Sequence, residues 1–498
     1  MIRNLKILVI SILSISNFSC LSENRPTADA IANNNRPNIL ILLTDDQSFN
    51  TINALGNKEI STPNIDKLVS NGFTFTHAYI MGSFSGAVCM PSRAMLMTGQ
   101  YLQKLDKVQG AIGENIKTIP QLLKESGYTT FFTGKWHNRK ASFFKSFTNG
   151  ENIFMGGMSN HLKVPLYNFD PSGIYPDKNK FFKDKFSSVL FKEAAVNFLR
   201  QYDGIKPFFA CVSFTSPHDP RMAPDDYQKK YNTEAISLPK NFMSKHNFNN
   251  GELIIRDENL LPFPRTKSDV KGEIASYYAM ISEVDFNIGE ILNELKKNKF
   301  YDDTIIIFTS DNGLAVGQHG LLGKQNIYDH SVRVPMIISG PGIKNGVFSE
   351  SLVYLNDIFP TITDLIGIEK PKTVDGKSLL PILKNPNNSV RNSVFLMYKN
   401  FQRGIRTKDW KLINYLVEGK KTTQLFHLKS DPLETNNLAQ EFKYKEKINE
   451  MNGLLQKWIN ISGDKVDLSK EDWGVPASKS WETKRKEQGL SLDFKGNY

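Results

Sequence analysis

The feature that most restricts the fold of this chain is a series of short runs, rich in apolar and β-branched residues, with helical patterns between them. The runs cover residues 38–43, 128–133, 208–214, 304–309 and 334–338. Because these runs lack the polar alternation of a half-exposed strand, they are typical of parallel strands buried on both faces. The sequence therefore predicts an α/β fold, in which a large, mostly parallel sheet is sandwiched by helices.

Helices between these runs can be placed from capping residues and periodicity. Thr118 is a suitable N-cap, and Gly127 can end the helix that follows it. Residues 277–298 have apolar side chains three and four positions apart, which predicts a longer helix. Residues 138–185 and 219–272 show little periodicity, and long irregular stretches in a compact domain are usually functional loops.

The end of the chain predicts a second, smaller domain. A linker-like patch at residues 385–390 ends the large domain, which we place at residues 37–385. Short strand-like runs and a helix near residues 441–460 predict a small antiparallel α+β domain over residues 390–462. Residues 463–498 are polar and form a C-terminal extension.

Residues 1–19 have the pattern of a secretory signal peptide. A basic start precedes an apolar stretch at residues 7–16. As a helix this stretch spans about 15 Å, half of a bilayer core of roughly 30 Å, so export is favoured over a membrane span. Cys20 resembles a lipoprotein cleavage site, although simple cleavage nearby is the alternative. With residues 20–36 as a tether, we expect an exported protein in the periplasm or at the cell surface, anchored to the outer membrane by lipid on Cys20.

The charge balance favours an anionic partner. The chain has 62 Lys and Arg against 51 Asp and Glu, a net charge of +11. Residues 1–19 carry two basic and no acidic side chains, so their removal leaves +9. This excess suits a polyanion, whereas export and the lack of a nucleic-acid motif argue against nucleic acid. Three cysteines exclude a disulfide scaffold.

Four of the predicted strands are followed directly by polar or charged residues. Ligands of open α/β sheets bind beyond the carboxyl ends of the strands. One such ending is usually a cap or a turn, but four at one sheet edge predict a site. The segments are Thr44-Asp45-Asp46, Gly134-Lys135-Trp136-His137, Thr215-Ser216-Pro217-His218 and Ser310-Asp311-Asn312-Gly313.

The acidic endings predict a metal site. Asp45, Asp46, Asp311 and Asn312 offer only oxygen ligands. Hard cations such as Ca²⁺ and Mg²⁺ prefer oxygen, whereas zinc usually takes His or Cys. Three neighbouring carboxylates would repel one another without a cation, so one divalent ion is expected, with Ca²⁺ fitting at least as well as Mg²⁺.

The segment Cys89-Met90-Pro91-Ser92-Arg93 carries the most specific signal. It resembles the Cys-x-Pro-Ser-Arg motif of the formylglycine-dependent sulfatases, which belong to the alkaline-phosphatase-like superfamily. The four strand endings agree with that family in order and content, and Lys324 follows Asp311 by the family's spacing. The resemblance covers roughly residues 36–462.

The resemblance implies that Cys89 is oxidised to 3-oxoalanine, or formylglycine, by a formylglycine-generating enzyme or an anaerobic sulfatase-maturating enzyme. One hydroxyl of the hydrated aldehyde then attacks sulfur, and the other expels sulfate. The implied metal, one Ca²⁺, acidifies the attacking hydroxyl. Its implied ligands are Asp45, Asp46, Cys89, Asp311 and Asn312.

The resemblance also implies roles for the cationic residues. Arg93, Lys135 and Lys324 neutralise the sulfuryl oxygens. His218 protonates the leaving alkoxide with help from Lys324, and His137 orients or deprotonates the second hydroxyl. The alternative for Cys89 is a plain buried cysteine, or one paired with Cys211.

The sequence departs from the family after Gly-Lys-Trp-His, where Asn138-Arg139 replaces Leu-Gly and puts the shape of that loop in doubt. The departure could turn Arg139 toward substrate. Basic residues of the irregular regions are further candidates, although a solvated surface is their alternative. The candidate substrate-binding residues are Arg139, His161, Arg221, Arg265 and His319.

Together these observations predict a sulfatase that acts on a sulfated polysaccharide or its oligosaccharides, from marine algae such as ulvan or carrageenan, or a host glycosaminoglycan. One alternative is a phosphomonoester or phosphonate hydrolase of the same superfamily, although a two-zinc phosphatase would need more His and Asp ligands. Another is a surface lipoprotein that binds polyanions without catalysis, which would have no need of Cys89 in that motif.

Overall fold

The computed structural model describes residues 36–105 and 110–473, which belong to one compact unit. The predicted signal peptide, Cys20 and nearly all of the tether lie outside the described residues, as does most of the C-terminal extension. Within the described part of the chain, no helix is long and apolar enough to cross a bilayer.

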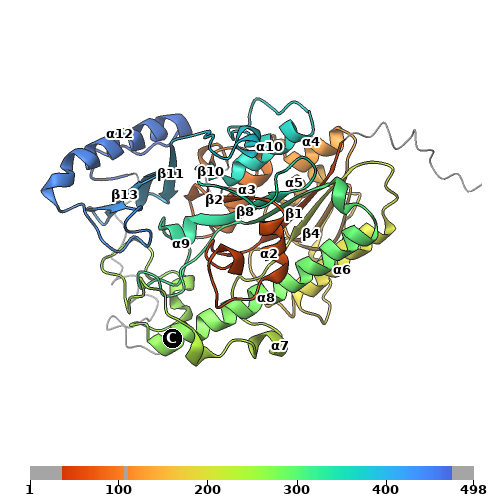
Figure 1. The fold of residues 1–498 in the computed structure, drawn as a ribbon, viewed down its shortest axis with the longest axis horizontal. Coiled ribbons are helices and arrows are strands. Elements are labelled where there is room, and N and C mark those ends of the chain that lie inside the picture. The colour runs from red at the N-terminus through yellow and green to blue at the C-terminus, as the bar shows by residue number, and fades with distance from the viewer. Residues whose placement is uncertain (1–35, 106–109, 474–498) are drawn as a thin grey trace, which may run out of the picture. The chain divides into compact units, whose positions relative to one another are not determined.

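The larger sheet contains all five predicted runs as neighbouring strands. Its order is β10-β2-β8-β7-β1-β6-β4-β5, with β9 beside β2. β1 pairs in parallel with β6 and β7, and β4 pairs in parallel with β5 and β6, so the mostly parallel sheet is confirmed (Figure 1). The strands are β1 (Asn38–Thr44), β2 (Phe73–Tyr79), β4 (Thr129–Lys135), β5 (Asn149–Phe154), β6 (Phe208–Ser213), β7 (Thr304–Ser310), β8 (Arg333–Ser339), β9 (Val347–Ser349) and β10 (Val353–Tyr354).

One of the predicted strands runs against the others. β8 pairs antiparallel with both β7 and β2. The connection from β7 to β8 holds the four-residue helix α9 (Asp329–Val332) rather than a long crossover helix. A parallel return needs such a crossover and an antiparallel one does not, which explains the direction of β8.

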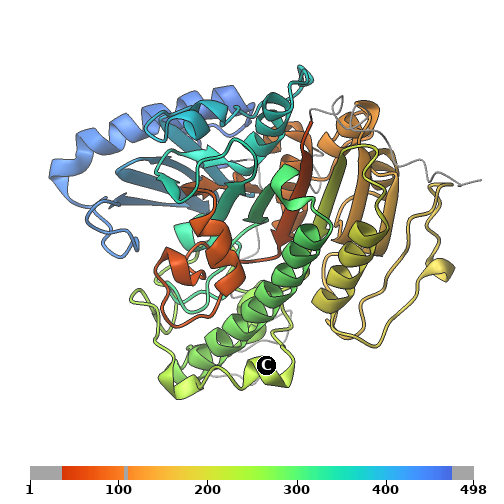
Figure 2. The same ribbon diagram turned by 45° about the vertical axis from the view of Figure 1, so that its right-hand side comes forward.

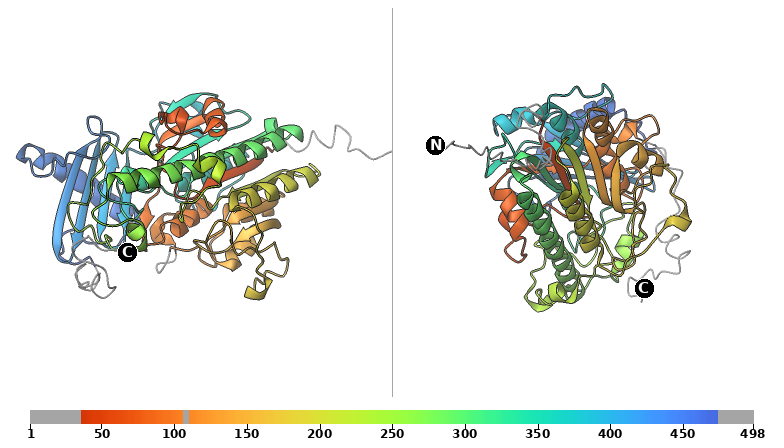
Figure 3. Two further views of the ribbon diagram at one scale, coloured as in Figure 1. Left: turned by 90° about the horizontal axis from the view of Figure 1, so that it is seen from below. Right: turned by 90° about the vertical axis from the view of Figure 1, so that its right-hand side faces the viewer.

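Helices cover both faces of this sheet because alternate residues of each strand point to opposite sides. Leu40 and Leu42 of β1 pack in one apolar cluster with α2, α6 and α8, whereas Ile39 and Ile41 pack in another with α3, α4 and α10. Figure 2 shows α6 and α8 side by side, and Figure 3 shows helices flanking the sheet. These helices are α2 (Pro63–Ser70), α3 (Cys89–Thr98), α4 (Ile119–Glu125), α5 (Lys140–Ser146), α6 (Ser187–Gln201), α8 (Lys267–Lys297) and α10 (Ile358–Leu365).

The predicted caps and helix limits can be compared with the structure. The Thr118 side chain accepts a hydrogen bond from the Gln121 backbone N–H, which confirms it as the N-cap of α4. The long predicted helix is α8, but it begins at Lys267 because Thr266 caps it. The irregular region after β6 therefore ends at residue 266, and it contains short helices, α7 (Asp225–Gln228) among them.

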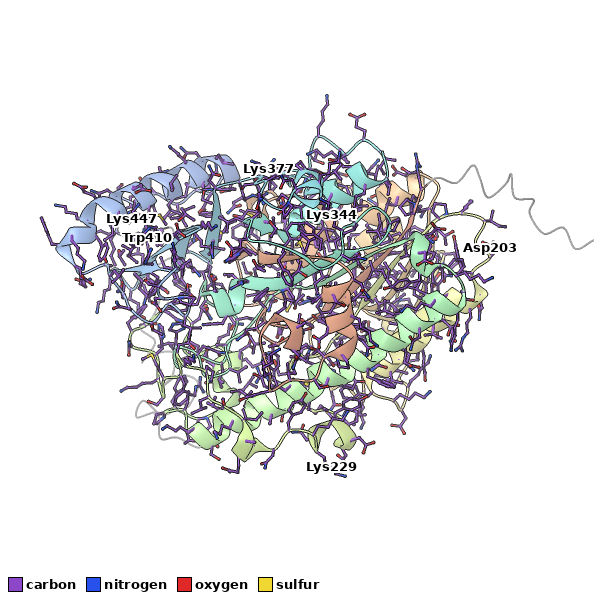
Figure 4. The ribbon with its side chains drawn as sticks, in the orientation of Figure 1. Asp203, Lys229, Lys344, Lys377, Trp410 and Lys447 are labelled. Carbon is purple, nitrogen blue, oxygen red and sulfur yellow. The ribbon has the colours of Figure 1, made fainter. Side chains whose placement is uncertain are left out.

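A second sheet is formed by β11 (Ser393–Tyr398), β12 (Gln402–Thr407), β13 (Trp410–Val417) and β14 (Lys420–His427), which pair antiparallel as predicted. α12 (Lys445–Ser462) packs on it. The Lys447 ammonium lies 5.5 Å from the centre of the Trp410 ring, and both are labelled in Figure 4. The predicted boundaries at residues 385–390 stay a prediction.

The short strand β3 (Gly82–Ser83) comes from the N-terminal part of the chain but pairs in parallel with β11 of the second sheet. Gly82 has a φ of 116°, and a Cβ at this position would lie 1.7 Å from the Met397 carbonyl oxygen. The close approach therefore requires glycine. Because β3 is followed closely by α3, the second sheet holds the segment that leads to Cys89.

Candidate active site

The carboxyl ends of β1, β4, β6 and β7 meet the N-terminus of α3. Cys89 is the first residue of α3 and is 1% exposed. Its Sγ lies 3.2 Å from Asp45 Oδ1 and 3.5 Å from Asp46 Oδ1, and Lys324 Nζ donates to it at 2.9 Å. Cys89 and Cys211 are both free, so a disulfide between them is absent from the described residues.

Two cations hold the carboxylates of Asp45 and Asp311 in place. Lys135 Nζ donates to Asp45 Oδ2 at 2.5 Å, and Arg93 Nε donates to Asp311 Oδ2 at 2.8 Å. Arg93 Nη1 also donates to Ser213 Oγ at 2.5 Å and to the Lys135 carbonyl at 2.6 Å. Arg93 therefore ties the ends of β4, β6 and β7 together, and charge-assisted bonds of this kind are the strong ones.

The donors in this site fit a divalent cation. Ligand atoms of Asp45, Asp46, Cys89 and His218 all lie within 4.8 Å of one another. The Oδ1 atom of Asn312 is buried and lacks a hydrogen-bond partner among the described residues, while its amide nitrogen donates to Asp46 Oδ1 at 2.7 Å. Buried carboxylates beside an unpaired amide oxygen match the oxygen ligands of a hard cation. His218 lies in this cluster by distance, although the sequence analysis did not include it among the metal ligands.

The carboxylates differ in their acidity. Burial and the charge of Asp311 raise the pKa of Asp45 to about 7. Burial also pushes the pKa of Asp46 upward, but the charges of Lys324 and Lys135 outweigh it and lower that pKa below its usual value. Like charges brought together in a buried site disfavour ionisation, and cations favour it.

Burial favours the neutral forms of the thiol and the two imidazoles of the site. It raises the pKa of the Cys89 thiol well above its usual value, helped by the nearby carboxylates. It lowers the pKa values of His137 and His218 well below their usual value. The strongest charged contributor is Lys135 for His137 and Lys324 for His218. The unmodified thiol is therefore a poor nucleophile here, because the thiolate is the reactive form.

The His218 ring is oriented by the residue that follows it. Its Nδ1 donates to the Asp219 carbonyl oxygen at 2.8 Å and lies 3.3 Å from Asp219 Oδ1. A carbonyl oxygen only accepts, so Nδ1 carries a proton and Nε2, 3.7 Å from Asp46 Oδ2, faces the site. His161 is buried and lies 3.0 Å by its Nε2 from the His218 carbonyl, so it supports the backbone of His218.

The loop after β4 holds His137 and the departure from the family motif. His137 has a φ of 50°, and its Nδ1 is buried without a hydrogen-bond partner among the described residues. Asn138 fastens the loop, because its side chain accepts from the Ile112 N–H at 3.0 Å. Arg139 has an exposed side chain, and its carbonyl accepts from Trp136 Nε1 at 3.1 Å.

The remaining substrate-binding candidates make contacts within the protein. Arg221 is 5% exposed by its side chain and forms an ion pair with Glu273 at 2.5 Å. Arg265 is 2% exposed and pairs with Glu258 at 2.7 Å. The ring of His319 stacks on a tyrosine, with centroids 4.1 Å apart. Their roles toward substrate stay predictions.

Several residues around the site were not identified from the sequence. Asp219 and Arg256 form a two-bond ion pair, and Asp257 accepts from Gln325. Glu258 accepts from backbone N–H groups next to Lys324. The signal that could have found them is the run of three charged residues, Arg-Asp-Glu, at 256–258.

Comparison with known proteins assigns the family. A family model described as "Sulfatase" matches residues 37–368, and one described as "N-sulphoglucosamine sulphohydrolase, C-terminal" matches residues 317–460. An N-acetylglucosamine-6-O-sulfatase of Bacteroides thetaiotaomicron is 27% identical, over 85% of this chain and 86% of that protein. An ulvan-active sulfatase of Formosa agariphila is 27% identical, over 91% of this chain and 86% of that protein.

Solved structures agree in fold. A protein solved in complex with its substrate, D-glucosamine-2-N,6-O-disulfate, has a TM-score of 0.73 at 25% identity, covering 86% of this chain and 99% of that one. A phosphonate monoester hydrolase of Agrobacterium radiobacter has a TM-score of 0.71 at 22% identity, covering 86% of this chain and 96% of that one, a likeness of fold alone. With a family model that spans residues 37–368, the chain belongs to the sulfatase family and is a sulfuric ester hydrolase.

Proposed function

We propose that this sulfatase removes sulfate from a sulfated polysaccharide or its oligosaccharides, using a formylglycine made from Cys89 and one bound Ca²⁺. The observation that carries the proposal is the placing of Cys89 at the start of α3, within hydrogen-bond distance of Asp45 and Lys324. This arrangement puts the nucleophile, the acidic ligands and a cation around one position.

The glycan part of the proposal is supported by the relatives. Two of them are named for sulfated sugars, N-acetylglucosamine-6-O-sulfate and ulvan, and the solved neighbour holds a sulfated glucosamine. The formal charge of +11 also suits a polyanion. A marine algal polysaccharide and a host glycosaminoglycan both stay within this proposal.

The metal would be held by Asp45, Asp46, Asp311 and Asn312, with the residue at position 89 as a further ligand. When bound, a divalent cation lowers the pKa of a coordinated hydroxyl and polarises a sulfate oxygen. Formylglycine supplies a hydroxyl nucleophile in place of the neutral thiol.

The protein's own residues then bind and orient the ester. Arg93, Lys135 and Lys324 line the site as fixed cations that stabilise negative charge on the sulfuryl oxygens. His218 presents Nε2 to the site and would hold the proton for the leaving alkoxide. The negative charge of a bound sulfate ester raises the pKa of a neighbouring imidazole, which favours this protonated form. His137 would orient the second hydroxyl.

Phosphonate or phosphate ester hydrolysis is the competing reaction, since a phosphonate monoester hydrolase shares the fold. Turnover of 4-nitrophenyl sulfate and 4-nitrophenyl phosphate by the same preparation separates the two. We expect the sulfate to be favoured, and a preference for the phosphate would overturn the proposal.

Export is a further part of the proposal. We propose that residues 1–19 are removed and that Cys20 carries lipid, which places the enzyme on the outer membrane facing the periplasm or the cell surface. Incorporation of labelled palmitate into the full chain, and its loss in Cys20→Ala, is the expected result. Labelling that survives in Cys20→Ala would refute it.

The first test is the mass of the peptide around Cys89 after co-expression with a formylglycine-generating enzyme. Conversion lowers the mass by about 18 Da, and activity on sulfated glycans should follow the converted fraction. Cys89→Ala should abolish turnover, whereas Cys211→Ala, which alters another buried free cysteine, should retain it. If the enzyme is active while Cys89 remains a thiol, formylglycine at this position is not the nucleophile.

A further inference from the structure

A short helical turn, Arg256–Leu260, lies in the irregular segment between β6 and α8. Its first three residues are charged, and each contacts a different part of the active site. They lie in the structure next to the two residues assigned to proton donation, His218 and Lys324. This turn has no role in the mechanism described above.

Arg256 holds the acidic partner of His218. Its Nη1 donates to Asp219 Oδ2 at 2.7 Å, and its Nη2 donates to Asp219 Oδ1 at 3.0 Å. Asp219 in turn receives the Nδ1–H of His218 on its carbonyl and places Oδ1 3.3 Å from the same nitrogen. A two-bond guanidinium–carboxylate pair fixes the plane of the carboxylate. The orientation of the His218 ring therefore depends on Arg256 through Asp219.

The other two charged residues of the turn, Asp257 and Glu258, form hydrogen bonds to the residues on either side of Lys324. Asp257 accepts from Gln325 Nε2 at 2.8 Å, and this nitrogen also contacts the Gly86 carbonyl, three residues before Cys89. Glu258 accepts from the backbone N–H groups of the two residues before Lys324, at 2.9 to 3.1 Å. The turn thus holds both proton-donor candidates from one short element.

Arg256 itself is occupied by protein groups. Nε and Nη2 donate to Asp257 Oδ1 at 3.1 and 2.6 Å, in addition to the two bonds to Asp219. All three nitrogens of the guanidinium are thus paired with carboxylates, although its side chain is 45% exposed. This pairing fits a residue that positions other groups and does not fit one that captures a substrate anion.

We propose that Arg256 is a positioning residue of the sulfatase reaction, which acts through Asp219 to hold the His218 imidazole in line with the leaving oxygen. The inference rests on the proposed function, in which His218 donates the proton that the alkoxide takes when the sulfur–oxygen bond breaks. In that reaction the formylglycine hydroxyl oxygen would form a new bond to sulfur as the ester sulfur–oxygen bond breaks, and His218 would give its proton to the leaving oxygen. Water would then restore the hydrated aldehyde after sulfate leaves, so water is the only co-reactant.

The test compares two substrates whose leaving groups differ in their need for a proton. 4-Nitrophenyl sulfate releases a stable phenolate, whereas phenyl sulfate releases a more basic one that depends on the acid. In Arg256→Met we expect kcat for phenyl sulfate to fall by at least about 10-fold more than kcat for 4-nitrophenyl sulfate, as part of the 10²–10⁴-fold that general acid catalysis supplies. Arg256→Lys should recover part of this difference, and KM should change little.

The matched control is Arg200→Met. Arg200 also forms a two-bond pair with a carboxylate, that of Glu294, and its side chain is 58% exposed, but it lies on α6. We expect the same ratio of the two kcat values as in the wild type. Formylglycine content by mass spectrometry should be equal in all the variants compared.

A second variant tests the same contact in case Arg256→Met fails to fold. Asp219→Asn keeps the shape of the side chain but removes its charge, and it should produce the same dependence on leaving group. The double variant with Arg256→Met should be no worse than either single one, because both act through one contact. An equal loss for both substrates, or an additive double variant, would overturn the inference. If converted wild-type protein hydrolyses no sulfate ester at all, the proposed function fails instead.

Discussion

At the scale of single residues, the active site concentrates buried charge. Asp45, Asp46 and Asp311 are each less than 5% exposed, and their charges are offset by Arg93, Lys135 and Lys324. Three acids against three bases leave the site near neutrality before substrate or metal enters. Because these groups are buried and paired with one another, their positions need little rearrangement on binding, which is what electrostatic catalysis requires.

A divalent cation should stabilise this arrangement. We expect Ca²⁺ to raise the melting temperature of protein stripped with a chelator, since a ligand that binds only the folded state stabilises it by mass action. Asp311→Asn should reduce that shift, because one carboxylate is lost from the site. Differential scanning fluorimetry with and without Ca²⁺ measures it, independently of turnover. A shift of equal size in Asp311→Asn would argue against this ligand.

A second prediction concerns a buried acid on α8, outside the site. Burial raises the pKa of Glu283 to about 7, although Asn287 donates to it at 2.6 Å. The unfolded chain ionises this group near its usual value of 4.5, so folding stability falls as the pH rises from 4.5 through 7. Glu283→Gln lacks this loss and should be more stable than wild type by up to about 3 kcal/mol at pH 8.

The gain should vanish at about pH 3, more than one unit below the usual pKa of 4.5, where the wild-type side chain is protonated in both states. Urea unfolding at the two pH values measures it. Glu294→Gln on the same helix is the control with the opposite sign, because hydrogen bonds from Arg200 lower the pKa of Glu294. It should lose stability at high pH. A Glu283→Gln effect independent of pH would contradict the assigned ionisation.

At the scale of elements, the short strand β3 carries the chain from the larger sheet into the second sheet. It lies a few residues before Cys89 in the sequence. Its pairing with β11 depends on Gly82, whose backbone touches the Met397 carbonyl. A side chain there must push β3 away from β11, its neighbour in the second sheet, and Cys89 follows seven residues later. Stability and activity are therefore coupled at this strand.

Gly82→Ala should lower both the melting temperature and kcat. The control is Gly56→Ala, which also has a positive φ, 111°, but has no atom within 4 Å of the added Cβ. The control should cost about 1 kcal/mol, from backbone strain alone, and leave kcat unchanged. Gly82→Ala should cost clearly more, as measured by urea unfolding. Equal losses in the two variants would show that the contact with Met397 is unimportant.

At the scale of the whole described unit, a buried ion cluster joins the second sheet to the first. Lys411 of β13 is fully buried and pairs with Asp329 at 2.8 Å and with Glu434 at 2.6 Å. Asp329 begins α9, next to β8 of the larger sheet, and also accepts from the Tyr79 hydroxyl of β2 at 3.0 Å. One lysine therefore neutralises acids that belong to the contact between the two sheets.

Lys411→Met should leave two buried carboxylates without their lysine partner and lower the unfolding free energy by about 3–5 kcal/mol. The loss should be larger at pH 8 than at pH 5, since protonation relieves part of it. Lys408→Met is the control, because the Lys408–Glu350 pair is exposed on both sides and such pairs contribute about 0–1 kcal/mol. Chemical denaturation of the three proteins decides the matter, and a loss no greater than that of the control would contradict the prediction.

Much of the fold could be predicted from local patterns. The five apolar runs became neighbouring strands, and Thr118 became the cap of α4, because burial periodicity and capping are properties of a few adjacent residues. The direction of β8 could not be predicted in this way. It depends on how the chain returns after β7, which is a property of the packed sheet.

The candidate site divides in the same way. Strand ends and the Cys89 motif pointed to side chains that the structure brings into contact, Asp45, Asp46, Lys135 and Lys324 among them. Charges in the irregular loops were harder to interpret. Arg221 and Arg265 suggested a basic surface, but each side chain is at most 5% exposed and paired with a glutamate. A charge read from sequence carries no information about its partner.

The sequence by itself determined the strand-rich α/β class, the family motif and the edge of the sheet at which the polar residues collect. These depend on residue type and short-range spacing, which a linear chain states directly. Only the tertiary structure decided that Arg256 pairs with Asp219, that Lys411 joins the two sheets and that β3 leaves its neighbours for β11. Each of these contacts joins residues at least 37 positions apart, and the pairing of such residues is settled by which burial leaves the fewest charges and backbone groups unsatisfied.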